Sequence, residues 1–228
     1  MKIQLLAILL FSNIVTINDD YMQIFGDDYQ DALVYLTENE SYIDSLSNKF
    51  GNDHKLLKAI IFPELIRYSL IRDYLEIGSL ELIYVSTGKI DFSIGTFQMK
   101  PSFIENLEKY FKSHMDLFKK YDNYLPYLSE RPIDIRKERL MRLKSMEYQL
   151  VYLNLFYDLM EKWHPNVFLK DKEYQVRFLS TAYNHGFEAS VEEISSYMNK
   201  KFFPFGINND KRKYNYSDIA WDYIDKNF

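Results

Sequence analysis

Three short stretches of this 228-residue chain place polar side chains among apolar ones. Glu64 lies in "AIIFPELIRY", Gln98 lies in "DFSIGTFQMKP", and Tyr183 and Asn184 lie in "TAYNHG". Burying a polar group costs free energy unless the group is hydrogen-bonded, and burying a charge costs much more. We therefore take these four side chains as the first candidates for chemistry.

Glu64 has the surroundings of a general acid. Apolar neighbours raise the pKa of a carboxyl group, because desolvation disfavours its charged form. A carboxylic acid that stays protonated near neutral pH can act as a general acid. Arg67 would lower that pKa if it paired with Glu64, so we expect its side chain to point elsewhere. The alternative interpretation is a glutamate on a helix surface that pairs with Arg67 or Arg72.

The other two stretches also have structural explanations. The chain contains only 7 glycines, and Gly95 stands three residues before Gln98. A glycine turn that leads into a helix begun by Pro101 accounts for this pattern, with Gln98 bonding the loop backbone. In the same way, Asn184 can cap the end of a helix and Tyr183 can belong to the core.

The order of the three stretches is more specific than any one of them. A glutamate at the end of an apolar helix, then S-x-G-x-x-Q, then A-Y-N-x-G resembles the lysozyme-like superfamily, in particular the bacterial lytic transglycosylases. The resemblance covers about residues 53–190. It rests on Glu64, on Ser93-Ile94-Gly95-Thr96-Phe97-Gln98-Met99 with Pro101, and on Ala182-Tyr183-Asn184-His185-Gly186. The later stretch "KYNYSDIAWDYI" is similar to the closing tyrosine-bearing helix of that family.

The resemblance implies an activity and a role for each residue. Glu64 would act as acid and then as base in cleaving the β-1,4 bond between N-acetylmuramic acid and N-acetylglucosamine in peptidoglycan. The 6-hydroxyl of the muramic acid replaces water, which gives a 1,6-anhydromuramyl product and needs no second carboxylate. Gly95 would let the backbone approach the sugar, and the Tyr183 hydroxyl would lie near Glu64. The implied substrate-binding residues are Ser93, Gly95, Gln98, Met99, Tyr183 and Asn184.

Departures from the family pattern mark the chain as a divergent member. Leu65 follows the glutamate where the family usually has serine. Thr96 and Phe97 precede the glutamine where Leu-Met is usual, and His185 stands where alanine is common. The interval between the glutamate and the glutamine is also longer than in most members.

Three alternatives stay open beside the transglycosylase. Asp91 precedes the loop roughly where goose-type lysozymes keep an acidic residue that positions water, so the protein can be a muramidase, a hydrolase with Asp91 as second carboxylate; the other interpretation of Asp91 is a loop cap. A catalytically inactive glycan-binding or scaffold member of the same fold is the second alternative. The third is an ordinary helical envelope protein, in which Glu64, Gln98 and Tyr183 would lie far apart.

The elements that must position these residues are helices. Pro63 should kink or restart the apolar helix that carries the glutamate, and Pro101 should begin a helix through about Tyr121. Apolar residues recur every three or four positions near residues 137–162, which predicts one long central helix. The strand signal is weak throughout. We therefore predict a mainly α, lysozyme-like single domain with a long central helix and a short Gly-x-x-Gln loop lining a glycan groove.

The N-terminus predicts export. Lys2 followed by the apolar run Ile3–Phe11 resembles a secretory signal peptide, and the run is too short for a comfortable membrane span. We predict a signal peptide in residues 1–18, an N-terminal helical extension in 19–52 and the lysozyme-like catalytic domain in 53–228. The expected location is the periplasm or cell envelope of a bacterium, which suits a chain with no cysteine.

Composition limits the partners and cofactors. The net charge is −5 and no long basic run is present, which argues against nucleic acid as a partner. The 4 histidines are scattered without metal-ligand spacing, and no phosphate loop occurs, so we predict no metal and no cofactor. The expected partner is the peptidoglycan glycan strand, bound by a monomer. An envelope-spanning machine is a further partner class.

Overall fold

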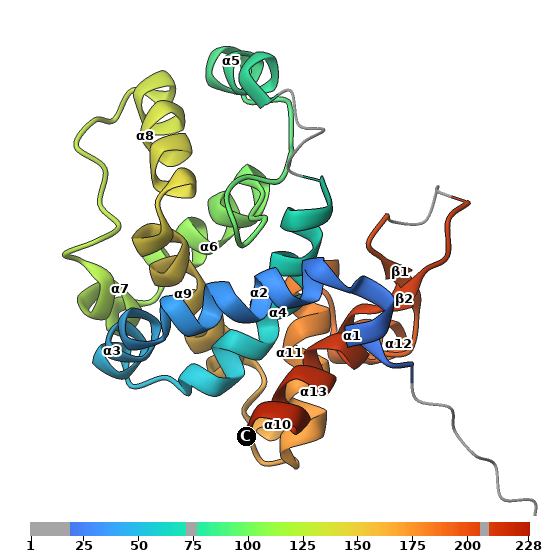
Figure 1. The fold of residues 1–228 in the computed structure, drawn as a ribbon. Coiled ribbons are helices and arrows are strands. Elements are labelled where there is room, and N and C mark those ends of the chain that lie inside the picture. Colours follow the sequence, from blue (N-terminus) through green and yellow to red (C-terminus); the bar gives the residue numbers. More distant parts are fainter. Residues whose placement is uncertain (1–18, 72–76, 206–209) are drawn as a thin grey trace, which may run out of the picture.

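The computed structural model describes residues 19–71, 77–205 and 210–228, and this part of the chain is mainly helical (Figure 1). A two-stranded antiparallel sheet is its extended element. The elements in chain order are α1 Tyr21–Phe25, α2 Asp27–Glu38, α3 Glu40–Phe50, α4 His54–Ile71, α5 Ile77–Thr87, α6 Pro101–Ser113, α7 Met115–Tyr121, α8 Pro132–Lys144, α9 Met146–Trp163, α10 Pro165–Phe168, α11 Lys172–His185, α12 Val191–Tyr197, β1 Lys201–Phe203, β2 Tyr214–Asn215 and α13 Tyr216–Asn227.

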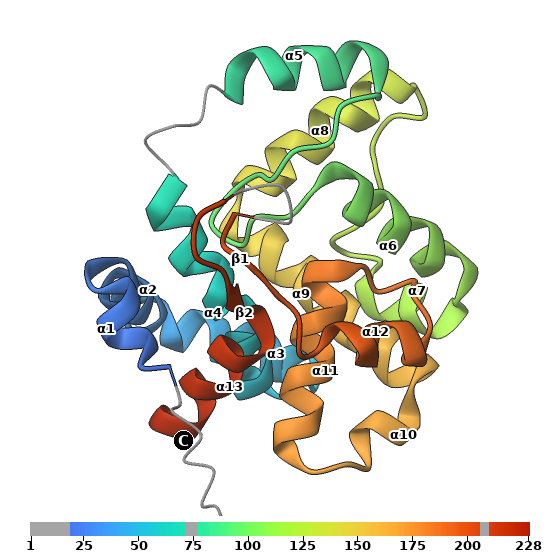
Figure 2. The same ribbon diagram turned by 90° about the vertical axis from the view of Figure 1, so that its right-hand side faces the viewer.

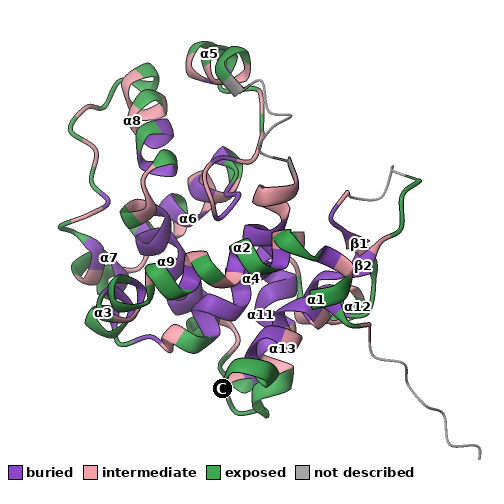
Figure 3. Cartoon of the chain, in the orientation of Figure 1, coloured by how far each residue is buried: buried purple, intermediate pink, exposed green. Residues whose placement is uncertain are grey.

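Helices α4 and α9 organise the packing. α4 packs against α2, α11 and α13, whereas α9 packs against α3, α6 and α8. Every residue from Gln149 to Met160 of α9 is buried, as expected for a helix with apolar side chains around most of its circumference. Figure 1 and Figure 2 both place α5 and α8 at one end of the molecule and α10 and α13 at the other. The buried residues in Figure 3 gather on the helices between these ends.

The long central helix predicted near residues 137–162 is in fact two helices. Ser145 separates α8 from α9 in an extended conformation (φ −94°, ψ 124°). The Gln149 side chain bridges the break, because its Nε2 donates to the carbonyl of Leu143 at 2.6 Å. The prediction was wrong at this point because both helices bury apolar faces, so the hydrophobic period runs through the break without registering it.

The two other helices for which a proline was expected to set a boundary also differ in part from expectation. Pro101 begins α6 as predicted, but α6 ends at Ser113 and α7 continues to Tyr121, so the single helix predicted over this range is also two. His114, in an extended conformation, divides them. Pro63 lies inside α4, and no new helix starts there.

The predicted extension, residues 19–52, packs closely on the residues that follow it. α2 lies along α4, and the Tyr29 hydroxyl donates to Asp222 of α13 at 3.1 Å. The predicted signal peptide, residues 1–18, lies outside the described residues. Among the helices of the described ranges, none combines the length and apolar character needed to cross a membrane.

Candidate functional site

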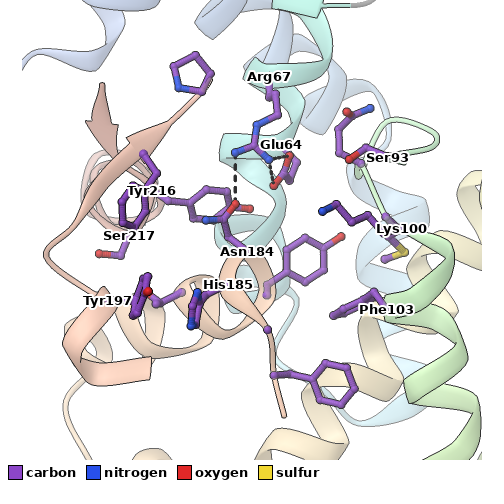
Figure 4. Close-up of a pocket in the computed structure, with 18 of the residues that line it drawn as sticks. Glu64, Arg67, Ser93, Lys100, Phe103, Asn184, His185, Tyr197, Tyr216 and Ser217 are labelled. Carbon is purple, nitrogen blue, oxygen red and sulfur yellow. Dashed lines mark hydrogen bonds and ion pairs between the residues drawn. The ribbon is translucent and has the colours of Figure 1, made fainter. Parts of the chain in front are cut away.

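A cleft of about 740 Å³ lies beside α4, with α11 and α13 on one side and the segment leading into α6 on the other (Figure 4). This volume is typical of small-molecule sites. Seven of the eight predicted residues line it, from three segments far apart in the sequence: Glu64, Asp91, Ser93, Gln98, Met99, Tyr183 and Asn184. Gly95 is the exception.

Helix α4 presents Glu64 to the cleft as a buried side chain, only 2% exposed. Pro63 precedes it inside the helix and has no N–H to give to the carbonyl one turn earlier. The Tyr216 hydroxyl, at the start of α13, lies beside Glu64 and donates to the carbonyl of Ile60 at 3.0 Å. The α13 terminus therefore closes over the part of α4 that carries the carboxyl group.

Arg67 pairs with Glu64, so the expectation that it points elsewhere is wrong. Its Nη1 lies 2.7 Å from each carboxylate oxygen of Glu64, and its Nη2 donates to Asn184 Oδ1 at 3.3 Å. The three-residue spacing puts both side chains on one face of α4. The guanidinium also lies over the rings of Phe203 and Tyr216, 5.0 and 5.9 Å from their centroids, where cation–π attraction holds it.

The protonation of Glu64 is set by opposing effects. Burial raises its pKa above the ordinary value, and Arg67, Tyr216 and Lys100 each offset part of that rise. Burial, together with the nearby charge of Glu64, raises the pKa of Tyr183 and of Tyr216. Both phenols are therefore neutral near pH 7, and the balance at Glu64 lies mainly between burial and Arg67.

The loop from Ile94 to Met99 is a tight turn packed on α9. Ile94 and Met99 exchange backbone hydrogen bonds of 2.9 and 3.2 Å. Gly95 has φ +70°, and a β-carbon there would lie 1.9 Å from Gln149 Nε2 and 2.5 Å from the carbonyl of Leu143. Glycine is therefore required by the packing of the loop on α9, and Gly95 itself does not line the cleft.

Three helices hold this loop in place. The Phe97 N–H donates to Gln149 Oε1 of α9 at 2.7 Å, and the Phe97 carbonyl accepts from the Tyr183 hydroxyl of α11 at 2.8 Å. The hydroxyls of Thr96 and of Tyr35 in α2 lie 3.2 Å apart. Tyr183 thus gives its proton to the loop, although it lies close enough to the carboxyl group of α4 to feel its charge.

Gln98 carries an unsatisfied acceptor at the wall of the cleft. Its backbone has φ +50°, a conformation uncommon for residues other than glycine. Its Nε2 donates to the carbonyl of Gly95 at 2.8 Å. Its Oε1 is buried and has no hydrogen-bond partner among the described residues. Because an unpaired buried acceptor costs free energy, a hydrogen bond to this oxygen from an N–H or O–H of a ligand would be favourable.

Asp91 lines the cleft and also caps α6. One carboxylate oxygen accepts the Ser102 N–H at 3.0 Å, and the other accepts the Ser102 hydroxyl at 2.8 Å. Both oxygens therefore serve the first turn of α6, which is the capping interpretation of Asp91. The same residue also belongs to the lining of the cleft.

Some lining residues were not predicted from the sequence. Lys100 has the extended backbone that a residue before proline prefers (φ −93°, ψ 146°), and its side chain points toward Glu64 in Figure 4. The ring of Tyr197 is stacked on His185, with centroids 3.7 Å apart, and Lys200 lies over its ring. Tyr216 could have been found from the stretch "KYNYSDIAWDYI", whereas nothing in the motifs distinguishes Lys100 or Tyr197.

Comparisons with known proteins found no match to this chain, whether with family models, with curated proteins or with solved structures. The described ranges also contain no group of three or more His, Cys, Asp or Glu side chains placed to hold a metal ion. The geometry of its own residues is therefore the guide to the chemistry of this site.

Proposed function

We propose that the protein is a peptidoglycan lytic transglycosylase with a lysozyme-like fold. The observation that carries the proposal is the meeting of Glu64, Gln98 and Tyr183 in one cleft, although α4, the 94–99 loop and α11 supply them separately. A chance match of motifs in an unrelated helical protein gives no reason for these three side chains to meet.

Cleavage begins with proton transfer from Glu64. In its neutral form Glu64 donates a proton to the glycosidic oxygen, the bond from that oxygen to C1 of the muramic acid breaks, and positive charge develops on that sugar. The resulting carboxylate takes the proton of the 6-hydroxyl of the same sugar while O6 bonds to C1. The leaving N-acetylglucosamine end keeps the first proton, and Glu64 is neutral again. General acid–base catalysis of this kind contributes on the order of 10²–10⁴-fold.

The unpaired side-chain oxygen of Gln98 favours a substrate that carries N–H groups. Its Oε1 is buried and lacks a partner among the described residues, and Gln98 lines the same cleft as Glu64. An acetamido N–H of N-acetylglucosamine or N-acetylmuramic acid would satisfy such an acceptor. That hydrogen bond would offset the cost of leaving the acceptor unpaired.

A hydrolase is the second candidate, favoured by the position of Asp91 in the lining of the same cleft. Each oxygen of Asp91 accepts one hydrogen bond from Ser102 and keeps acceptor capacity for a water. Holding the first turn of α6 is a sufficient structural role for this carboxylate. We therefore prefer the transglycosylase, which uses the substrate's own hydroxyl and needs no second carboxylate.

This activity fits the export predicted from residues 1–18, because peptidoglycan lies outside the cytoplasm. We propose that the protein acts as a monomer on glycan strands in the periplasm or cell envelope, without a cofactor. An envelope-spanning machine that needs local opening of the wall is the further partner class.

Digestion of purified sacculi tests the proposal. The soluble products of the full protein are analysed by mass spectrometry. A transglycosylase releases muropeptides with 1,6-anhydromuramyl ends, which are lighter by one water than the reducing ends released by a hydrolase. Binding to sacculi without any release of muropeptides would instead identify an inactive glycan-binding member of the fold.

A further inference from the structure

The ion pair between Arg67 and Glu64 conflicts with the role of proton donor. A carboxylic acid donates a proton only when it is neutral, whereas a guanidinium 2.7 Å from both oxygens stabilises the carboxylate. The Glu64 side chain is 3% exposed and that of Arg67 is 18% exposed, so solvent screens the pair little. In the free protein, Arg67 therefore opposes the protonation that burial favours and that proton donation requires.

Among the described residues, charged and titratable groups face Glu64 from several of the elements packed around it. Arg67 comes from α4 itself, Tyr216 from α13, Tyr183 from α11, and Lys100 from the segment before α6. The tyrosines are neutral at physiological pH, because burial raises the pKa of both. Arg67 is the largest of the influences that favour the charged carboxylate, ahead of Lys100, which approaches from the exposed side of the cleft.

The remaining contacts of Arg67 do not depend on Glu64. Its guanidinium lies over the rings of Phe203 and Tyr216, and its Nη2 donates to Asn184 at the long distance of 3.3 Å. Its Nε is buried without a hydrogen-bond partner among the described residues. Arg67 can therefore give up Glu64, keep its place on the aromatic rings and gain a partner for Nε from a ligand.

We propose that Arg67 is a positioning residue that pairs with the Glu64 carboxylate in the free protein and releases it when a glycan binds. This inference rests on the proposed function. On release, Glu64 takes one proton from solvent. Each turnover then returns Glu64 to the neutral form, because the 6-hydroxyl supplies a proton for the one donated. When the product leaves, Arg67 pairs with Glu64 again and the proton returns to solvent.

A direct titration tests this without any activity measurement. The protein is labelled with ¹³C at the side-chain carboxyl of glutamate, and the Glu64 resonance is assigned as the one missing from Glu64→Gln. In Arg67→Met the pKa of Glu64 should rise by about 1–3 units, the usual effect of removing a close opposite charge. Arg131→Met is the matched control, since Arg131 pairs with Asp134 at an exposed site outside the cleft. An unchanged Glu64 titration in Arg67→Met overturns the proposal.

Kinetic measurements distinguish an Arg67–Glu64 ion pair that is released when substrate binds from one that persists in the bound complex. The pH dependence of kcat/KM reports the free protein and that of kcat reports the bound complex. On soluble glycan strands, Arg67→Met should move the alkaline limb of kcat/KM to higher pH and leave the limb of kcat nearly in place. Arg67→Lys keeps the cation and should keep the parent profile. Equal shifts in both limbs, or no shift in either, contradict release on binding.

The two proposals fail in different ways. Full activity of Glu64→Gln would refute the proposed function, yet the carboxyl titration would still report whether Arg67 holds the carboxylate. A merely structural role of Arg67 would lower kcat and kcat/KM at every pH without moving either limb, and that result also overturns the inference. If Arg67→Met does not fold, Arg67→Gln removes the charge while keeping hydrogen-bond donors, and the same titration and profiles decide.

Discussion

Burial raises the pKa of Glu64 by more than Arg67 lowers it, so Glu64 binds its proton more tightly in the folded chain than in the unfolded chain. Between the ordinary pKa of a glutamate and the raised value, the folded state holds more protons than the unfolded state. The contribution of Glu64 to stability is therefore fully present below the ordinary pKa and is lost as the pH rises through the folded pKa.

Glu64→Gln should remove this pH dependence, because the amide does not titrate. The free energy of unfolding, measured by urea titration between about pH 4 and pH 8, should fall with pH in the parent relative to the variant. Each unit by which the pKa is raised contributes about 1.4 kcal/mol to that difference. Parallel curves for the two proteins would show that the folded chain does not shift the titration of Glu64.

Gln98 offers a test that separates binding from folding. Gln98→Gly relieves the positive φ but removes the carboxamide, so stability should stay within about 1 kcal/mol of the parent. Murein cleavage should fall by about tenfold or more if Oε1 accepts a hydrogen bond from the sugar. Gln98→Ala should lose as much activity and more stability, since alanine keeps the strained backbone. Full activity of the glycine variant would exclude Gln98 from substrate binding.

Asp91 distinguishes the two enzymatic candidates. Asp91→Asn should keep most of the cleaving activity and still yield anhydro products, because a transglycosylase needs no activated water. The thermal midpoint should fall slightly, since the amide nitrogen cannot accept the second hydrogen bond from Ser102. A large loss of rate, with reducing ends in the parent's products, would make Asp91 the second carboxylate of a hydrolase.

At the scale of single elements, one side chain of α9 positions part of the site by bonding backbone groups. The 94–99 loop is fixed to α9 by the Gln149 carboxamide, which also bonds the carbonyl of Leu143 at the break between α8 and α9. The break at Ser145 therefore helps to place the loop that carries Gln98. Packing of α8 and α9 and the geometry of the cleft are linked at this one side chain.

Gly95→Ala should disturb this contact severely. A β-carbon at this position would lie 2.5 Å from a backbone carbonyl, and alanine disfavours φ +70°. We expect a loss of about 2 kcal/mol or more in the free energy of unfolding. Gly78→Ala in α5 is the control, because its β-carbon meets nothing and alanine favours a helix, so it should be neutral or stabilising by up to about 1 kcal/mol. Equal stability of the two variants would contradict the packing described for the loop.

The period of apolar residues was enough to predict that these segments are helical, but not where the helices break. The glycine at position 88 ends α5, and Pro101 begins α6, as local backbone preferences dictate. Ser145 and His114 interrupt helices where the apolar pattern continues. At Ser145 the Gln149 side chain bonds the carbonyl of Leu143 across the break, and at His114 the ring lies against the carbonyl of Tyr110. A period of apolar residues carries no signal for such side-chain contacts.

At the scale of the whole molecule, the chain brings together side chains that the sequence separates widely. The order of the motifs was enough to predict that Glu64, Gln98 and Tyr183 share a cleft. The pairing of Arg67 with Glu64 was one of the alternatives left open. The sequence could not decide it, because a three-residue spacing permits contact but does not fix the rotamer of a long side chain. Phe203, which helps to hold Arg67 in place, comes from a segment that the motifs do not reach, whereas Tyr216 lies in the stretch similar to the family's closing helix.

The most direct test of the proton-donor role is digestion of purified sacculi by the parent and by Glu64→Gln at equal concentration. Glutamine has nearly the same shape but no proton to give, so the variant should fold and should release muropeptides on the order of 10²–10⁴-fold more slowly. Circular dichroism at the same pH checks that the helices are intact. A folded Glu64→Gln protein that digests sacculi as fast as the parent would show that Glu64 is not the acid.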